Sequence, residues 1–195
     1  MLETLALIAP LMLSPGPANL AAFALGTRHG LTGMLRFLLG VLLVYGFVAF
    51  AVGWLSDSLL GRYESWRAVW QTLGGLFVIW LGVKFWRRPA SDGSDGPPAT
   101  GPTLIEGAAL QLLNPKYPAV TLTVYSAELG APWWMRATLL TLVGAAGLGL
   151  YASAGAATDR LATGSRATRR RDAACGLMLV LVGVWLIGRA WFATA

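Results

Sequence analysis

Six apolar segments, each about as long as a bilayer is thick, dominate the pattern of hydrophobic and polar positions. An α-helix needs about 17 to 25 apolar residues to cross the hydrocarbon core of a membrane. Charged residues gather between these segments rather than along one face of them. The pattern therefore predicts an all-α integral membrane protein, a single domain over residues 1–195 with six transmembrane helices. The segments cover approximately residues 2–25, 35–55, 69–86, 104–127, 133–157 and 173–192.

The longest polar gap lies near the middle of the chain and separates three segments from three. It runs from Arg87 to Thr103 and is rich in proline, glycine and aspartate. Such a composition is typical of a flexible connection. We therefore expect a cytoplasmic linker, about residues 87–103, between a first repeat, about 1–90, and a second repeat, about 104–195.

The two halves also resemble each other. Residues 75–83 in the third segment match residues 176–184 in the sixth, and Pro15 in the first segment corresponds to Pro115 in the fourth. Because each half has an odd number of spans, the second must enter the membrane from the opposite side. This predicts two inverted-topology three-helix repeats, a layout in which transporters bind substrate near the midplane between broken helices.

The first and fourth segments each contain a helix break at mid-span. The first holds SPGPAN over residues 14–19, and the fourth holds QLLNPKYP over residues 111–118. Proline removes a backbone N–H and clashes with the preceding turn, and glycine adds flexibility. Inside a bilayer such a break is tolerated only where protein buries it or where it lines a wet cavity. The expected break and gating residues are Pro15, Gly16, Pro17, Pro115 and Pro118.

Lys116 is the only charged residue deep in any predicted span. A lysine at the bilayer centre costs about 2.5–3.5 kcal/mol on insertion scales. In a structural interpretation, its ammonium pairs with carbonyls freed by the breaks. In a functional interpretation, it faces a cavity and binds an anionic group such as a carboxylate, with helix N-termini just after Pro17 and Pro118 presenting N–H groups to the same anion.

Four other polar side chains lie near the breaks. Asn19 and Asn114 can hydrogen-bond either the interrupted backbone or a substrate. Gln111 lies one helical turn before Asn114 and could face the same cavity. Tyr45, in the middle of the second segment, can donate or accept through its hydroxyl or simply pack. The candidate substrate-binding residues are therefore Lys116, Asn114, Asn19, Gln111 and Tyr45.

Composition and charge agree with a membrane protein and orient it. The chain is 56% hydrophobic and only 12% charged, against about 25% charged in soluble domains. Basic residues are concentrated on one side, which the positive-inside rule places in the cytoplasm. Both termini should then lie outside, in a multi-pass protein of the inner (cytoplasmic) membrane, and the net charge of +6 does not indicate nucleic-acid binding. The two sets are Arg28, Arg36, Lys84, Arg87, Arg88, Arg160, Arg166, Arg169, Arg170 and Arg171 against Arg62, Arg67, Arg136 and Arg189.

Several chemistries have no sequence support. Phosphate-loop, zinc-protease and serine-hydrolase motifs do not occur, and Cys175 is the only cysteine. We therefore expect no enzyme activity, no cofactor and no metal site, and any active transport must use an ion gradient. No carboxylate lies deep in a predicted span, which argues against a divalent-cation exporter and leaves the ion-coupling residue unassigned.

Small residues recur at four-residue spacing in the fifth segment. Such a stripe allows close helix–helix packing in membranes. It predicts a seam either within the protomer or across a homodimer. The residues are Ala145, Gly149, Ser153 and Ala157.

Two short signatures together resemble a known family. SPGP over residues 14–17 and LNPK over residues 113–116 resemble the lysine exporter superfamily, specifically its homoserine/threonine exporter branch, and the resemblance covers essentially the whole chain. It implies an inner-membrane exporter of amino acids or related small metabolites, driven by the proton-motive force. Members commonly carry Asn or Asp where this chain has Ala18, and many carry an acidic or amide residue near Tyr45. Both departures remove polar groups from the expected cavity, whereas Asn114 and Lys116 are retained.

These observations predict a secondary exporter of amino acids or related small carboxylate-bearing metabolites, with H⁺ as the coupling ion. A non-transporting scaffold or sensor with purely structural breaks is the main alternative, and an intramembrane enzyme or a metal-ion exporter is less favoured. A cavity that reaches Lys116 from one side would favour transport. A fully packed midplane would favour the scaffold.

Overall fold

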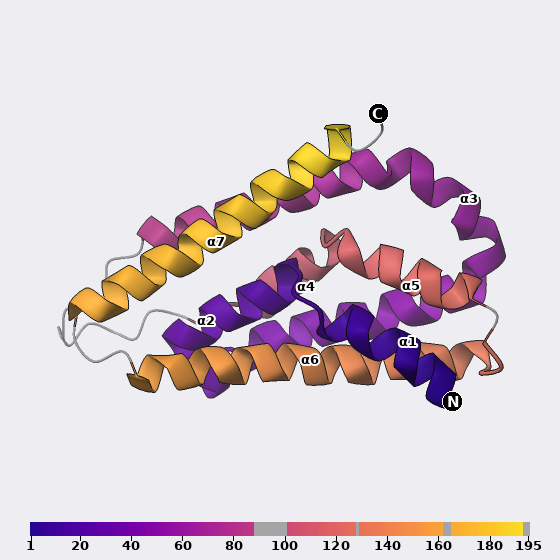
Figure 1. Ribbon diagram of the computed structural model, residues 1–195, viewed down its shortest axis with the longest axis horizontal. Coiled ribbons are helices and arrows are strands. Elements are labelled where there is room, and N and C mark those ends of the chain that lie inside the picture. The colour runs from indigo at the N-terminus through magenta and orange to yellow at the C-terminus, as the bar shows by residue number, and fades with distance from the viewer. Residues whose placement is uncertain (88–100, 128, 162–164, 193–195) are drawn as a thin grey trace.

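A computed structural model describes residues 1–87, 101–127, 129–161 and 165–192, and these residues form an all-helical bundle (Figure 1). The predicted helical class is therefore confirmed. Most of the predicted linker, residues 88–100, lies outside the described residues. The helices are α1 (Leu2–Leu13), α2 (Pro17–Gly33), α3 (Leu35–Arg87), α4 (Leu104–Leu112), α5 (Lys116–Ser126), α6 (Trp133–Leu161) and α7 (Ser165–Phe192).

Length and apolar character qualify three helical stretches of the described chain as membrane spans. These are Leu35–Leu55, Trp133–Thr158 and Ala167–Gly188. The pair α1 and α2 adds a fourth when it is counted as one span bent by 55°. The bend confirms the predicted break in the first apolar segment. The fourth apolar segment is divided into α4 and α5, which have 9 and 11 residues and are too short to cross a bilayer alone.

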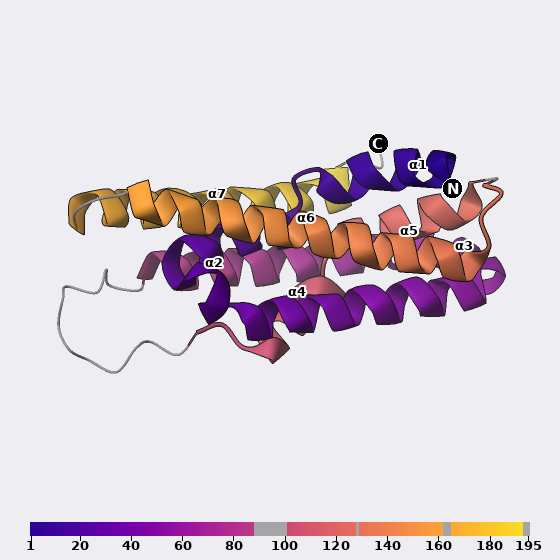
Figure 2. The same cartoon turned by 90° about the horizontal axis from the view of Figure 1, so that it is seen from below.

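The second and third apolar segments form one continuous helix, which the hydropathy pattern did not predict. α3 has 53 residues and turns back on itself, so that its first half lies beside α6 and its second half beside α7 (Figure 1). No proline occurs between Leu35 and Arg87, so the backbone can keep its helical hydrogen bonds where the helix turns. α6 packs along α2, the end of α1 and the first half of α3 (Figure 2).

Glycines let the second half of α3 and α7 approach closely. A Cβ on Gly75 would lie 2.7 Å from the carbonyl oxygen of Gly183, and one on Gly183 would lie 2.5 Å from that of Gly75. Gly82 and Gly176 repeat this reciprocal contact at 2.7 and 2.9 Å. The two helices therefore pack through backbone contacts two helical turns apart, as small residues allow in membranes.

The small-residue stripe of the fifth segment is not the packing seam within the protomer. On α6 the seam against α2 lies instead on Ala152 and Gly155, where a Cβ on Gly155 would overlap the Phe23 carbonyl. Ser153 and Ala157 of the predicted stripe are exposed, and a Cβ on Gly149 would meet open space. The helix rotation set by α2 thus turns the stripe outwards, and its use in a homodimer stays a prediction.

We predict that Gly183→Ala destabilises the protein. The new methyl would collide with the Gly75 carbonyl oxygen and with Ile79, whose Cγ1 atom would lie 2.6 Å away. Overpacking of this kind costs about 1–3 kcal/mol, or about 2–4 °C in melting temperature for each kcal/mol in a chain of this size. Thermal unfolding of the detergent-solubilised protein, followed by tryptophan fluorescence, measures the change.

Gly188→Ala on the same helix is the matched control, because a Cβ there would meet nothing within 4 Å. Alanine is also the better helix former, so this variant should keep or raise the melting temperature. Equal melting temperatures for the two variants would mean that α3 and α7 do not pack through Gly183.

Candidate functional site

The two helix breaks meet in the interior of the bundle, and Lys116 joins them. From the start of α5, its Nζ atom donates hydrogen bonds to the carbonyl oxygen of Ser14, at 2.6 Å, and to the Ser14 hydroxyl, at 2.9 Å. Ser14 in turn donates its hydroxyl to the carbonyl of Leu11 at 2.9 Å. The lysine thus satisfies a carbonyl that the first break has freed, which is the contact that the structural interpretation predicts.

Gly16 leaves the room that this lysine needs. A Cβ on Gly16 would lie 2.6 Å from Cδ and 3.2 Å from Nζ of Lys116. Gly16 has φ −152° and ψ 170°, an extended backbone that any residue can adopt. The need for glycine therefore comes from the lysine side chain that crosses over it, not from backbone strain.

Asn19 closes the first break from the other side. Its Nδ2 atom donates to the carbonyls of Met12 and Ser14, both at 3.1 Å, and so satisfies the end of α1 from the first turn of α2. The side chain is 4% exposed, and the described residues offer its Oδ1 atom no hydrogen-bond partner. One half of this amide therefore repairs backbone, and the other half stays available as an acceptor.

Asn114 has the corresponding role at the second break. Its Oδ1 atom accepts from the backbone N–H of Lys116 at 3.1 Å, and its Nδ2 donates to Oε1 of Gln111 at 3.2 Å. Gln111 is buried and does not line the cavities around Lys116. The turn that α4 completes before Asn114 directs Gln111 to support that asparagine, and its direct contact with a substrate stays a prediction.

Pro118 does not break a helix. It is the third residue of α5, which begins at Lys116 and not after Pro118 as expected. Proline is tolerated in the first helical turn because the N–H groups there have no intrahelical acceptor. The second break therefore lies over residues 113–115, where α4 ends and Pro115 precedes α5.

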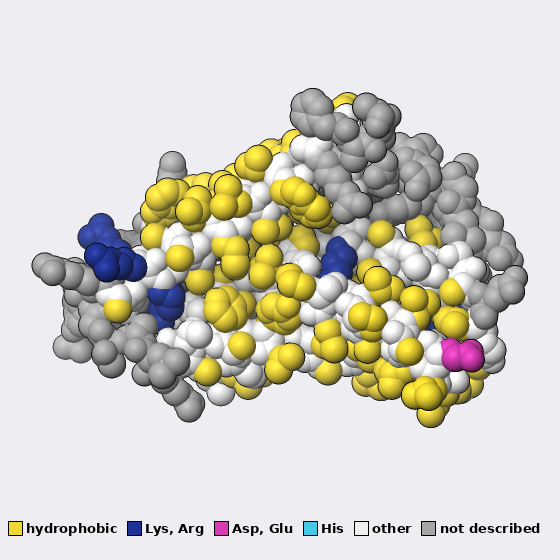
Figure 3. Space-filling model, in the orientation of Figure 1, with side chains coloured by type: hydrophobic (Ala, Val, Ile, Leu, Met, Phe, Trp, Pro, Cys, Tyr) yellow, Lys and Arg dark blue, Asp and Glu magenta, His cyan; other side chains and the backbone are white. Residues whose placement is uncertain are grey.

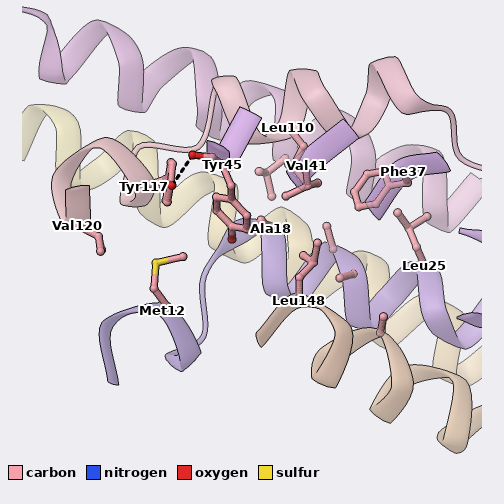
Figure 4. Close-up of a cluster of buried hydrophobic side chains, with 14 of the residues drawn as sticks. Met12, Ala18, Leu25, Phe37, Val41, Tyr45, Leu110, Tyr117, Val120 and Leu148 are labelled. Carbon is pink, nitrogen blue, oxygen red and sulfur yellow. Dashed lines mark hydrogen bonds between the residues drawn. The ribbon is translucent and has the colours of Figure 1, made fainter. Parts of the chain in front are cut away.

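Tyr45 of α3 packs against Tyr117 of α5, close to the second break. The Tyr117 hydroxyl donates to the Tyr45 carbonyl oxygen at 2.7 Å, and the two rings lie 4.4 Å apart between centroids (Figure 4). Both residues line a small cavity of about 10 Å³ that Ala18, Asn19, Asn114 and Lys116 also border. This space holds at most about one water molecule.

A much larger cavity reaches the same lysine from one side. Its volume is about 780 Å³, within the range of about 300–1,000 Å³ that is common for small-molecule sites. Its walls come from both breaks, from the second half of α3, and from α5 and α7. On the largely hydrophobic face that displays these helices, a basic side chain lies isolated near the centre, apart from the basic cluster at one end (Figure 3). The midplane is therefore not fully packed.

The opposite side of the site is closed. Leu25, Phe37, Leu110 and Leu148 belong to a buried apolar layer that continues from Ala18 (Figure 4). Beyond it, two ion pairs join neighbouring helices. Arg28 of α2 donates to Asp172 of α7 at 2.6 Å, and Lys84 of α3 pairs with Glu106 of α4, which also forms a capping box with Thr103.

The model for the LysE type translocator family matches residues 9–189, nearly the whole chain. The chain belongs to this family. Membership implies a membrane transporter, not an enzyme, that exports small solutes such as amino acids. The searches of curated proteins and of solved structures found no match.

One polar residue that lines this translocator's large cavity was not predicted from the sequence. Gln71 of α3 is 8% exposed, lines the cavity together with Lys116, and has an Oε1 atom for which the described part of the chain provides no partner. The chain contains only two glutamines, Gln71 and Gln111, and both occur in apolar segments. A glutamine in an apolar segment is the sequence signal that could have identified Gln71 as a candidate site residue, as it identified Gln111.

We predict that Gly16→Ala releases Lys116 from Ser14, because the new methyl occupies the path of the lysine side chain. Lys84 and Lys116 are the only lysines of the translocator. Labelling with a small amine-reactive reagent, followed by peptide mass spectrometry, can therefore report Lys116 with Lys84 as the internal reference. The ratio of Lys116 to Lys84 labelling should rise in the variant.

Gly149→Ala is the control, since its methyl would point into open space. It should leave the labelling ratio at the wild-type value. An unchanged ratio in Gly16→Ala would contradict the packing of Lys116 over Gly16.

Proposed function

We propose that this translocator is a secondary exporter of amino acids, or of related small metabolites that carry a carboxylate, and that the proton-motive force drives it. The signatures at residues 14–17 and 113–116 favour the homoserine/threonine exporter branch of the family. The observation that carries the proposal is the cavity of about 780 Å³ that reaches Lys116. A scaffold with purely structural breaks has no need for such a space.

Lys116 is the proposed carboxylate-binding group. Among the described residues no acidic side chain pairs with it, and its ammonium bonds only to neutral oxygens of Ser14. A substrate carboxylate that replaced these oxygens would bring a counter-charge to a partly buried cation. The N-terminus of α2 begins at Gly16 without a side-chain cap, so its free N–H groups add positive potential at the same point.

The cavity walls favour substrates with apolar side chains. Apart from Lys116 and Gln71, the cavity is bordered mostly by aliphatic and aromatic groups, such as Leu20, Val182 and Trp185. The small neighbouring cavity has Ala18 where family members commonly carry an amide or an acid. A small aliphatic amino acid therefore fits the lining better than a basic one.

The helix contacts support an inverted repeat. The matched segments 75–83 and 176–184 lie on α3 and α7, and their glycines contact each other reciprocally, Gly75 with Gly183 and Gly82 with Gly176. A two-fold axis between two equivalent helices would produce this pattern. The breaks before α2 and before α5 are the second pair that such an axis would relate.

The distribution of charge supports the expected orientation. Arg28, Lys84 and the neighbouring Arg171 lie at the closed end, whereas Arg136 lies beyond the end of α5 and donates to carbonyls of the following loop, including that of Ala131 at 2.8 Å. With the basic end in the cytoplasm, both termini lie outside the inner membrane. The large cavity then lies in the outer half of the bundle, and export requires a conformation that is open at the Arg28 end.

We predict that Lys116→Met abolishes transport without lowering thermal stability. Truncating one partner of a desolvated charge pair costs about 2–5 kcal/mol of binding free energy, so uptake at limiting substrate should fall by about thirtyfold or more. Stability should be kept because Asn19 still donates to the Ser14 carbonyl oxygen and methionine fills similar space without a buried charge. The assay is counterflow of radiolabelled L-leucine, L-threonine and L-lysine in proteoliposomes, with L-leucine expected to be the best substrate.

The same vesicles test proton coupling. An acidic exterior should accelerate efflux of preloaded amino acid, and a protonophore should remove this acceleration. Wild-type vesicles that exchange none of the three amino acids would refute the proposal. Full transport by Lys116→Met, with normal insertion of the protein, would remove the lysine from the site.

We predict that Asp172→Asn raises the population of a conformation in which the helix ends around Arg28, Lys84 and Arg171 separate. Asp172 accepts from both Arg28 and Arg171, at 2.6 and 3.1 Å, so the variant removes the negative charge that holds these two side chains together, at a cost of about 3 kcal/mol. Cys175 is buried one helical turn along α7 and is the only cysteine. The rate of its reaction with N-ethylmaleimide should rise in the variant.

Glu3→Gln is a matched carboxylate-to-amide control at the exposed start of α1. It should leave the rate at Cys175 unchanged. If Asp172→Asn also leaves that rate unchanged, the Arg28–Asp172 pair does not hold this end closed.

A further inference from the structure

Gln71 occupies an unusual position for an amide. It lies in the shorter apolar helical stretch Gln71–Lys84 of α3, is 8% exposed, and has an Oε1 atom without a hydrogen-bond partner in the described chain. Buried polar groups in native proteins are almost always paired, so an unpartnered one needs an explanation. A group that binds a ligand is unpaired when the ligand is absent.

The packing of α3 places Gln71 next to the second break. A Cβ on Gly74 would overlap the Leu113 carbonyl oxygen and lie 3.1 Å from Cδ of Pro115. Residues three apart lie on the same face of a helix, so Gln71 lies one turn from this contact. It lines the large cavity together with Lys116 and thus faces the same space from a different helix.

The cavity also lacks a negative charge. No acidic side chain is among its described lining residues, and the hydroxyls of Thr123 and Ser126 already donate to backbone carbonyls. An amine with no carboxylate of its own would find no counter-charge here. A zwitterion would, because its carboxylate lies at Lys116 while its ammonium donates to a neutral amide oxygen.

We propose that Gln71 is a substrate-binding residue whose amide oxygen accepts a hydrogen bond from the α-ammonium group of an amino acid bound at Lys116. Gln71 then selects neutral α-amino acids over carboxylates that lack the amine. This inference rests on the proposed transport function.

The test compares two ligands that differ only in the group that Gln71 would bind. L-Leucine and 4-methylpentanoate, which has hydrogen in place of the α-ammonium group, are used as unlabelled competitors of radiolabelled L-leucine counterflow in proteoliposomes. The wild type should be inhibited far better by the amino acid. Gln71→Leu should weaken inhibition by L-leucine by about tenfold or more, the effect of losing a hydrogen bond to a charged group, and should leave inhibition by 4-methylpentanoate nearly unchanged.

Two further variants separate binding from folding. Gln71→Glu keeps an acceptor and should preserve the preference for the amino acid, whereas Leu73→Ala, at an exposed position of the same helix, should behave as the wild type. Equal losses for both competitors in Gln71→Leu, or an unchanged preference, would overturn the role of Gln71 while leaving the transport function intact. A wild type that does not transport L-leucine would overturn both this inference and the proposed preference for apolar substrates.

Discussion

Two interrupted helices must satisfy their freed backbone groups inside a membrane, and the rest of the structure depends on this constraint. In lipid each unsatisfied N–H or C=O costs several kcal/mol. Here Asn19 binds the carbonyls of Met12 and Ser14, Lys116 binds Ser14 again, and Asn114 binds the N–H of Lys116. The polar residues must converge because the breaks do. A structural requirement has thus gathered a cation, two amides and a helix N-terminus at one depth.

Packing is asymmetric about this centre. On the basic side, glycine contacts bring backbones together, as at Gly26 with Ala152 and at Gly107 with Phe37, and ion pairs follow beyond them. On the other side the large cavity lies between α5 and α7. A conformational change that opened the basic end and closed the other would have to break these glycine contacts and ion pairs. Each of them is a contact between particular residues that is either made or broken. Such contacts favour two defined states over gradual deformation.

The helical class and the first break could be predicted from residues alone, because prolines around a glycine in an apolar segment leave few alternatives. The contact between Lys116 and Ser14 could only be hypothesised from the sequence, because the distance between two helices depends on how they pack. The continuity of α3 through residues 56–67 could not be read from hydropathy, which detects polarity and not backbone hydrogen bonding. Pro118 was misplaced because α5 begins at Lys116, before this proline and not after it. The contact of Gln111 with Asn114 depends on how the last turn of α4 is directed, which the residue pattern does not show.

The structural and functional interpretations of Lys116 do not compete. An ammonium partly buried among apolar helices needs an oxygen partner in every state of the protein, and Ser14 supplies two in the described conformation. A carboxylate that displaced Ser14 would replace neutral oxygens with a charged one, so the cation would be paired in both states and binding would not expose it. The displacement would also free the connection between α1 and α2 from the start of α5. A ligand can shift a conformational equilibrium only through contacts that differ between the states, and the exchange at Lys116 supplies such a difference where the two breaks meet.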